Sequence, residues 1–113
     1  MIRVSKSYEH GELNLSVEGH AERSKDEDVN LCCAGVSMLV NAATECLQRY
    51  AEVDWLEEIR VRNASGKSKL YAKAYGYTED KLSAIYDMLE AGFDLIKARY
   101  PDKITRGENK KQI

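Results

Sequence analysis

Residues 13–50 decide the fold, and they read LNLSVEGHAERSKDEDVNLCCAGVSMLVNAATECLQRY. Residues 13–17 alternate apolar and polar side chains, which predicts a β-strand with one buried face. Residues 22–28 contain no apolar side chain, so we expect them to form an exposed loop. From residue 31 to residue 50 apolar side chains recur every three or four positions, which predicts a helix with one buried stripe. Asn30 is the expected N-cap, which would make Cys33 the third residue of that helix.

The flanking sequence repeats this plan of two strands and a helix. Alternation in residues 2–8 predicts a strand that forms a hairpin with residues 13–17. Residues 55–62 and 69–75 predict a second hairpin, and a second helix follows from Thr78 until Pro101 ends it. Ile104 is a candidate for a short edge strand. We therefore expect an α+β fold with the order ββαββα: two layers, one antiparallel or mixed sheet, and two helices on one face.

Composition limits the class of protein. The chain has 113 residues, which suits one domain, and we place that domain at residues 1–105. Residues 106–113 form a charged tail, in which we expect disorder over residues 106–111. The net charge of −2 predicts no direct nucleic-acid partner, although it leaves room for a local basic patch. The sequence has no run of roughly 20 apolar residues, so we expect no membrane partner.

Cysteine usage points to a reducing compartment. The three cysteines are an odd number and two of them are adjacent, so they make a poor disulfide framework. Reduced thiols are typical of a cytoplasmic protein, and the spacing is not that of a zinc site. We expect neither a metal nor a cofactor.

His20 and Cys33 are the candidates for chemistry. His20 follows the predicted strand and Cys33 lies at the predicted helix start, so the loop between them can bring both to one edge of the sheet. A helix N-terminus favours a thiolate, and a cysteine with a nearby base is the minimum for covalent acyl transfer. The backbone N–H groups of Cys33 and Ala34 would hold the oxyanion, and Ala34 and Gly35 would leave room for a peptide backbone. If Asn30 caps the helix, however, its side chain could occupy one of these donors.

Simpler interpretations exist for the same residues. A cysteine near a helix start is usually a small core residue, and a histidine after a glycine is usually on the surface. Asn30 could orient His20 instead of capping the helix. Ser37, one turn after Cys33, could contact the thiol or the substrate, or bond back to its own helix. Cys46 lies among buried helical positions and is expected in the core.

Two short motifs resemble one known family. Gly19-His20-Ala21, followed by a charged loop and then Cys33-Ala34-Gly35-Val36-Ser37, is similar to the ribosomal-processing cysteine protease (Prp) family. The resemblance covers nearly the whole chain and implies the ββαββα fold, with Cys33 as nucleophile and His20 as base. It implies a dimeric endopeptidase that removes an N-terminal extension from large-subunit ribosomal protein twenty-seven of bacteria. A basic peptide of that kind would suit the acidic loop.

The chain departs from the family pattern around the cysteine. Asn30 replaces an aspartate and Asp28 replaces a glycine, and the loop is longer, so that spacing from His20 alone selects Cys32. The residues that follow favour Cys33. These departures leave two alternatives to the endopeptidase. One is a divergent paralogue that only binds, or that cleaves another protein, for example of a phage. The other is a redox switch between Cys32 and Cys33, which adjacent cysteines could form only with strain.

Overall fold

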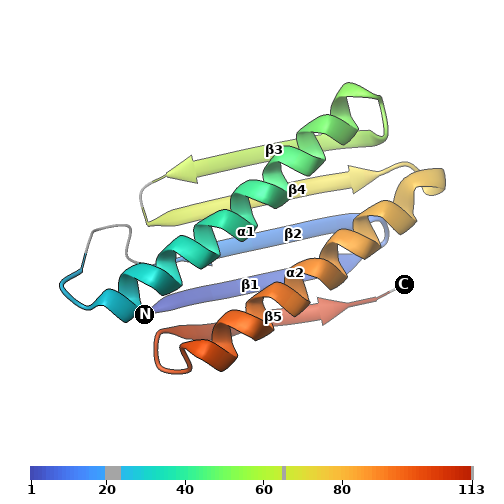
Figure 1. Ribbon diagram of the computed structural model, residues 1–113. Coiled ribbons are helices and arrows are strands. Elements are labelled where there is room, and N and C mark those ends of the chain that lie inside the picture. The colour runs from blue at the N-terminus through green and yellow to red at the C-terminus, as the bar shows by residue number, and fades with distance from the viewer. Residues whose placement is uncertain (20–23, 65, 113) are drawn as a thin grey trace.

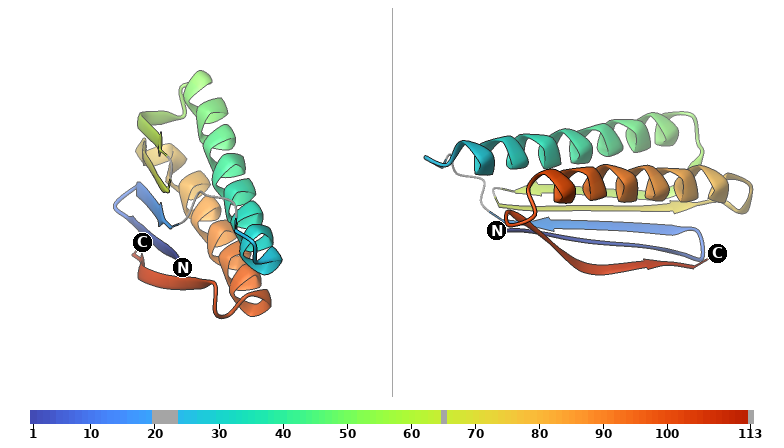
Figure 2. Two further views of the ribbon diagram at one scale, coloured as in Figure 1. Left: turned by 90° about the vertical axis from the view of Figure 1, so that its left-hand side faces the viewer. Right: turned by 60° about the horizontal axis from the view of Figure 1, so that its bottom comes forward.

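The computed structural model describes residues 1–19, 24–64 and 66–112 and confirms the predicted fold class (Figure 1). Its elements are β1 (Ile2–Glu9), β2 (Glu12–Glu18), α1 (Glu27–Glu52), β3 (Leu56–Ala64), β4 (Lys67–Ala74), a 3-10 turn (Gly76–Thr78), α2 (Glu79–Arg99) and β5 (Ile104–Lys111). The strand order is β3-β4-β2-β1-β5, with β1 parallel to β5 and the other neighbours antiparallel. Both helices cover the same face of this mixed sheet, and no other element of the described residues covers the opposite face (Figure 2).

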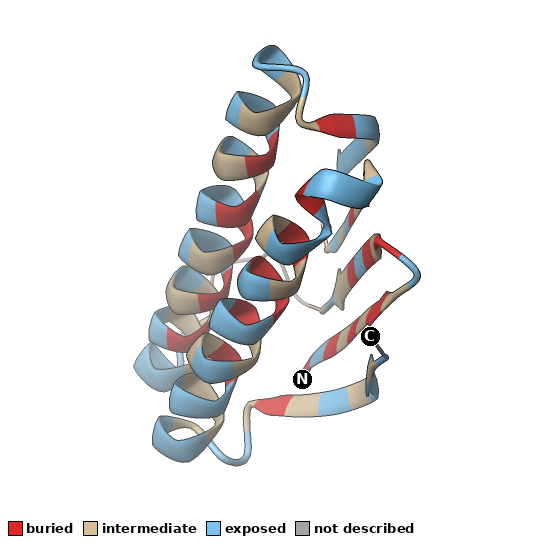
Figure 3. Ribbon diagram, turned by 90° about the vertical axis from the view of Figure 1, so that its right-hand side faces the viewer, coloured by how far each residue is buried: buried red, intermediate tan, exposed pale blue. Residues whose placement is uncertain are grey.

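The core lies between the sheet and the two helices (Figure 3). Alternate residues of β1, β2 and β4 point toward the helices and are buried, as the period of two predicts. The buried stripe of α1 consists of Cys32, Val36, Val40, Ala43 and Leu47, and that of α2 consists of Leu82, Ile85, Tyr86, Leu89 and Phe93. By length and composition alone α1 could cross a membrane, but here its stripe lies on the sheet.

Helix α1 starts earlier than the sequence pattern predicted. It begins at Glu27, and Asp26 is its N-cap, with a side-chain carboxylate that accepts the N–H of Asp28 at 3.0 Å. Lys103 lies 3.0 Å from the same carboxylate, and this interaction lowers the pKa of Asp26. Acidic side chains in a first turn are favoured by the helix dipole, so the charged residues extend the helix although none is apolar. Cys33 is therefore the seventh residue of α1.

The predicted charged tail is mostly a strand. β5 pairs with β1 from Ile104 onward, so the ordered domain continues to Lys111, and the expectation of disorder over 106–111 was wrong. Ion pairs between the cations of β5 and the carboxylates of α2 explain why this segment is ordered. Lys111 lies 2.7 Å from Asp87 of α2, and Arg106 forms an ion pair with Asp94. A polar strand can thus be held at the edge of the sheet by partners that its own sequence does not reveal.

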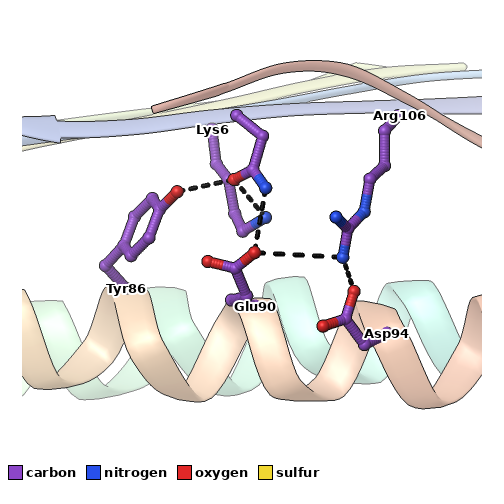
Figure 4. A network of polar contacts seen from close by, with 6 residues as sticks. Lys6, Tyr86, Glu90, Asp94 and Arg106 are labelled. Atoms are coloured by element: carbon purple, nitrogen blue, oxygen red, sulfur yellow. Dashed lines mark hydrogen bonds and ion pairs between the residues drawn. The ribbon is translucent and has the colours of Figure 1, made fainter. Parts of the chain in front are cut away.

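A partly buried polar network joins β1, β5 and α2 (Figure 4). The Nζ of Lys6, a residue that is only 3% exposed, donates to the Oδ1 of Asn109 at 2.7 Å. The Tyr86 hydroxyl donates to the same oxygen at 2.5 Å, and the Asn109 amide donates to Glu90 at 2.9 Å. Burial lowers the pKa of Lys6. Asn109 is the common partner in this network.

Candidate functional site

A cleft of about 170 Å³ opens where β2 ends, beside the second turn of α1. Cys33 and Ser37 line it from α1, while Gly19, Ala64 and Gly66 line it from the sheet. The N–H of Gly19 donates to the carbonyl of Gly66 at 3.0 Å, which joins the end of β2 to the β3–β4 hairpin. The cleft thus places a thiol next to the residue that precedes His20 in the sequence.

Two glycines make this close approach possible. A Cβ on Gly19 would lie 2.9 Å from the Cα of Ile2, and a Cβ on Gly66 would lie 2.8 Å from the carbonyl oxygen of Gly19. Real Cβ atoms essentially never come so close to backbone atoms. Gly66 also has a φ of +76°, which favours glycine. The sheet side of the cleft is therefore built from backbone, with no side chain at these two positions.

We expect Gly19→Ala to destabilise the protein by roughly 1–3 kcal/mol, because the added methyl group must displace backbone of β1. Urea unfolding followed by circular dichroism would measure the change. Gly76→Ala is the matched control, since a Cβ there meets nothing within 4 Å, and its effect should be small. Equal stability losses in both variants would contradict this account of the cleft.

Cys33 also lines a second cavity, of about 280 Å³, nearer the start of α1. Val29 of α1 and Ile2 of β1 contribute to it, as do Asp102 and Lys103 from the turn before β5. The Lys103 ammonium, which also pairs with Asp26, brings positive charge to this cavity. The Cys33 side chain is half-buried and borders both spaces.

The residues that follow Cys33 in the predicted motif do not all line the cleft. Ser37 lines the cleft with Cys33, as helical spacing predicted. Gly35 does not line the cleft. A Cβ on Gly35 would lie 3.5 Å from the Cδ1 of Ile96, so Gly35 faces α2. The expectation that it leaves room for a substrate is therefore not met. Ala34 is exposed.

The earlier start of α1 changes the expected oxyanion geometry. The expectation that the N–H groups of Cys33 and Ala34 lie in the first turn was wrong, because both residues are in the second turn of α1. There, backbone N–H groups donate to carbonyls four residues back within the helix. An oxyanion role for these donors stays a prediction, and it would require the start of α1 to open.

Asn30 does not cap α1 but is its fourth residue, so the prediction of a cap was wrong. Its Oδ1 accepts the backbone N–H of Ser24 at 2.9 Å, and its Nδ2 donates to the Ser24 carbonyl at 2.7 Å. This paired contact fixes the chain just before α1. His20 itself lies outside the described residues, as do residues 21–23, so its pairing with Cys33 stays a prediction.

The other two cysteines have structural surroundings. Cys32 is completely buried in the core, and burial raises the pKa of its thiol. A redox switch with Cys33 would need this inaccessible sulfur, which argues against that alternative. Cys46 was expected in the core; it is half-buried and packs against the core from its margin.

Sequence reasoning missed the residues that reach the site from elsewhere in the chain. Ala64 and Gly66 come from the β3–β4 hairpin, and Lys103 from the turn before β5. Their positions depend on the pairing of β2 with β4 and of β1 with β5. The Gly66 turn was visible in the sequence, but nothing local indicated that it would meet Gly19.

A half-buried cysteine in a cleft at the end of β2 defines a candidate thiol-dependent hydrolase. The model of the cysteine protease Prp family matches residues 1–105, and the chain belongs to that family. Solved structures agree in fold. The essential ribosomal processing protease Prp from S. aureus, in complex with a substrate peptide, has a TM-score of 0.69 at 14% identity, covering 96% of this chain and 100% of that one.

A second S. aureus structure, of the same protease with a covalently linked product peptide, has a TM-score of 0.67 at 14% identity over the same shares of both chains. SMU.848 from Streptococcus mutans has a TM-score of 0.69 at 19% identity, covering 99% of this chain and 96% of that one. No curated protein matches the chain. At these identities the structures show the shared fold, and the family match shows the class of enzyme.

Proposed function

We propose that this chain is a cytoplasmic endopeptidase that uses Cys33 and His20 to remove the N-terminal extension of ribosomal protein twenty-seven. The observation that carries the proposal is the cleft itself, which joins Cys33 to Gly19, the residue directly before His20. The related S. aureus protease was solved with a substrate peptide and with a covalently linked product peptide. A cleft bordered by a thiol suits the same kind of ligand here.

The proposed reaction has two steps. The Cys33 sulfur attacks the scissile carbonyl carbon, the C–N bond breaks, and His20 transfers the thiol proton to the leaving amine. Water then attacks the resulting thioester, which releases the new carboxylate and restores the thiol. Asp26, Glu27 and Asp28 lie at the start of α1, within about two helical turns of Cys33. Their negative charge supports a basic peptide as substrate.

Incubation of the protein with peptides that span the extended N-terminus of that ribosomal protein tests the proposal. Mass spectrometry should find two fragments whose masses add up to the substrate plus one water. A peptide of the same composition in reversed order is the control and should stay intact. If the folded protein leaves the native-order peptide uncut, or cuts both peptides equally, the proposed function is wrong.

A binding protein without catalysis is the second candidate, and one observation favours it. The N–H groups that could hold an oxyanion belong to an intact helical turn. Iodoacetamide labelling at neutral pH separates the two candidates. Rapid modification of Cys33 relative to Cys46 supports the peptidase, and equally slow modification of both supports the binding protein.

We further propose that the chain forms a homodimer through the outer side of its helices. Leu31 and Met38 of α1, and Met88 and Leu95 of α2, are exposed there at seven-residue spacing, although large apolar side chains usually avoid water. Analytical ultracentrifugation should show a dimer that Leu95→Asp weakens. A monomeric wild-type protein at micromolar concentration would contradict the proposal.

A further inference from the structure

The charges of this chain are segregated in the fold. Residues 59–78 contain five cations and no acidic residue, in a protein whose net charge is −2. Four of these cations, Arg60 and Arg62 on β3 and Lys67 and Lys69 on β4, alternate with other residues along adjacent strands. Alternation places them on one side of the sheet, opposite to the buried Leu70 and Ala72. We call these four residues the basic sheet face; it lies on the side that the helices leave bare (Figure 2).

The centre of this face brings like charges together. Arg62 and Lys69 are direct cross-strand partners, an arrangement that destabilises a sheet when both side chains are cationic. Within residues 1–19, 24–64 and 66–112, neither of them has a carboxylate within ion-pair distance. Together with Lys67 they line a pocket of about 190 Å³. An anion in this pocket would remove the repulsion.

The neighbouring acids neutralise the face only in part. Glu58 lies 2.9 Å from Arg60 and Glu18 lies 3.6 Å from Lys67. The side chains in both pairs are about half exposed or more, so these ion pairs are weak and easily exchanged for another anion. The face therefore keeps a positive field although the whole protein is slightly acidic.

A groove continues from the basic residues across the sheet. Its volume is about 680 Å³, and its lining includes Tyr71, Ser5, Asn14 and Ser16, with the acidic Glu18 and Glu108 also part of it. The guanidinium of Arg60 lies over the Tyr71 ring, 4.3 Å from its centre, which is a cation–π contact. Hydroxyl and amide groups can both donate and accept hydrogen bonds, so they suit sugar hydroxyls and phosphates.

We propose that the basic sheet face and this groove bind single-stranded RNA. Cations at every second strand residue, roughly 7 Å apart, can follow a phosphate backbone. The Arg60–Tyr71 pair offers a stacking surface for a base, and the serine hydroxyls can bond to the ribose 2′-OH. An acidic peptide fits less well, because peptide interfaces depend on buried apolar anchors and this face is polar. The net charge predicted no nucleic-acid partner; the arrangement of the charges indicates one.

Fluorescence anisotropy with a labelled single-stranded RNA of mixed sequence tests this proposal on the intact chain. At 50 mM salt we expect a dissociation constant of roughly 1–100 µM. Four phosphate contacts should weaken binding about 50-fold between 50 and 200 mM salt. Arg62→Glu/Lys69→Glu should abolish binding at 50 mM salt. Arg49→Glu/Arg99→Glu, with the same charge change on exposed helical positions, is the control and should bind as the wild type does.

A single variant separates binding from folding. Arg62→Glu turns the like-charge pair with Lys69 into an opposite-charge pair, so its melting temperature should equal or exceed that of the wild type while RNA binding falls at least tenfold. The proposal is overturned if both double variants lose binding alike, or if poly-glutamate or single-stranded DNA of the same sequence binds as tightly as the RNA. Peptide cleavage plays no part in this experiment, so it stands apart from the proposed function.

Discussion

Cys33→Ala is expected to reduce peptide cleavage by roughly four orders of magnitude or more, to the rate of the uncatalysed background. The reason is chemical, because no thioester can form without the sulfur. Among the described residues that line the cleft, Cys33 is the one cysteine. Cleavage of the ribosomal peptide, followed by mass spectrometry under single-turnover conditions, would measure the loss. Cys33→Ser should lose nearly as much, because a serine hydroxyl is a much poorer nucleophile than a thiolate.

The two remaining cysteines provide controls for this experiment. Cys46 is half-buried on a later turn of α1, so Cys46→Ala should keep nearly full activity. Cys32→Ala removes a completely buried side chain, so it should lower stability while the folded fraction still cleaves. Full activity of Cys33→Ala together with an inactive, folded Cys32→Ala protein would show that the loop length, and not the motif after the cysteine, identifies the nucleophile.

Asn109→Leu is expected to destabilise the protein by roughly 1–3 kcal/mol, the range for leaving a buried donor without its acceptor. Lys6 and Tyr86 both donate to the Oδ1 of Asn109, and leucine would leave the buried ammonium without that acceptor. Lys6→Met is the informative comparison, since it removes the buried charge itself and should cost less or even stabilise. Chemical denaturation at neutral pH would rank the variants. A Lys6→Met protein that is less stable than Asn109→Leu would contradict this interpretation.

The same network gives a pH dependence with a defined sign. Burial lowers the pKa of Lys6 in the folded protein below its ordinary value of 10.5. A group with a lowered folded pKa contributes stability above the unfolded pKa, and that stability is lost as the pH falls through the folded value. Stability of the wild type should therefore include a component that rises between the lowered pKa and 10.5. Denaturation curves of the wild type and Lys6→Met across this alkaline window should diverge by that component.

Periodicity was enough to predict most of the elements. The alternation in residues 2–8 and the spacing from Leu31 to Tyr50 gave a strand and a helix, because each has one buried face. The start of α1 was missed because Asp26 and its neighbours act through capping and charge, which hydrophobic periodicity does not register. β5 was missed beyond Ile104 because its stability comes from partners on α2, such as Asp87, that are distant in sequence.

The site was predicted from the sequence only in part. Cys33 and Ser37 share a cleft because helical spacing fixes their common face. The opposite wall, with Ala64 and Gly66, follows from the contact between hairpins, which no local pattern encodes. Gly35 illustrates the limit of motif reasoning, since its small size serves the packing of α1 on α2.

The parallel pairing of β1 with β5 has a consequence for how the chain folds as it is synthesised. β5 follows every other element in sequence, yet it covers the edge of the first strand and supplies Asn109 to Lys6. Until the ribosome has released residues 104–111, the emerging polypeptide must carry an open strand edge and a lysine without its acceptor. Contacts between such distant segments form slowly, so we expect completion of the sheet to be the last event of maturation, after translation has passed both helices.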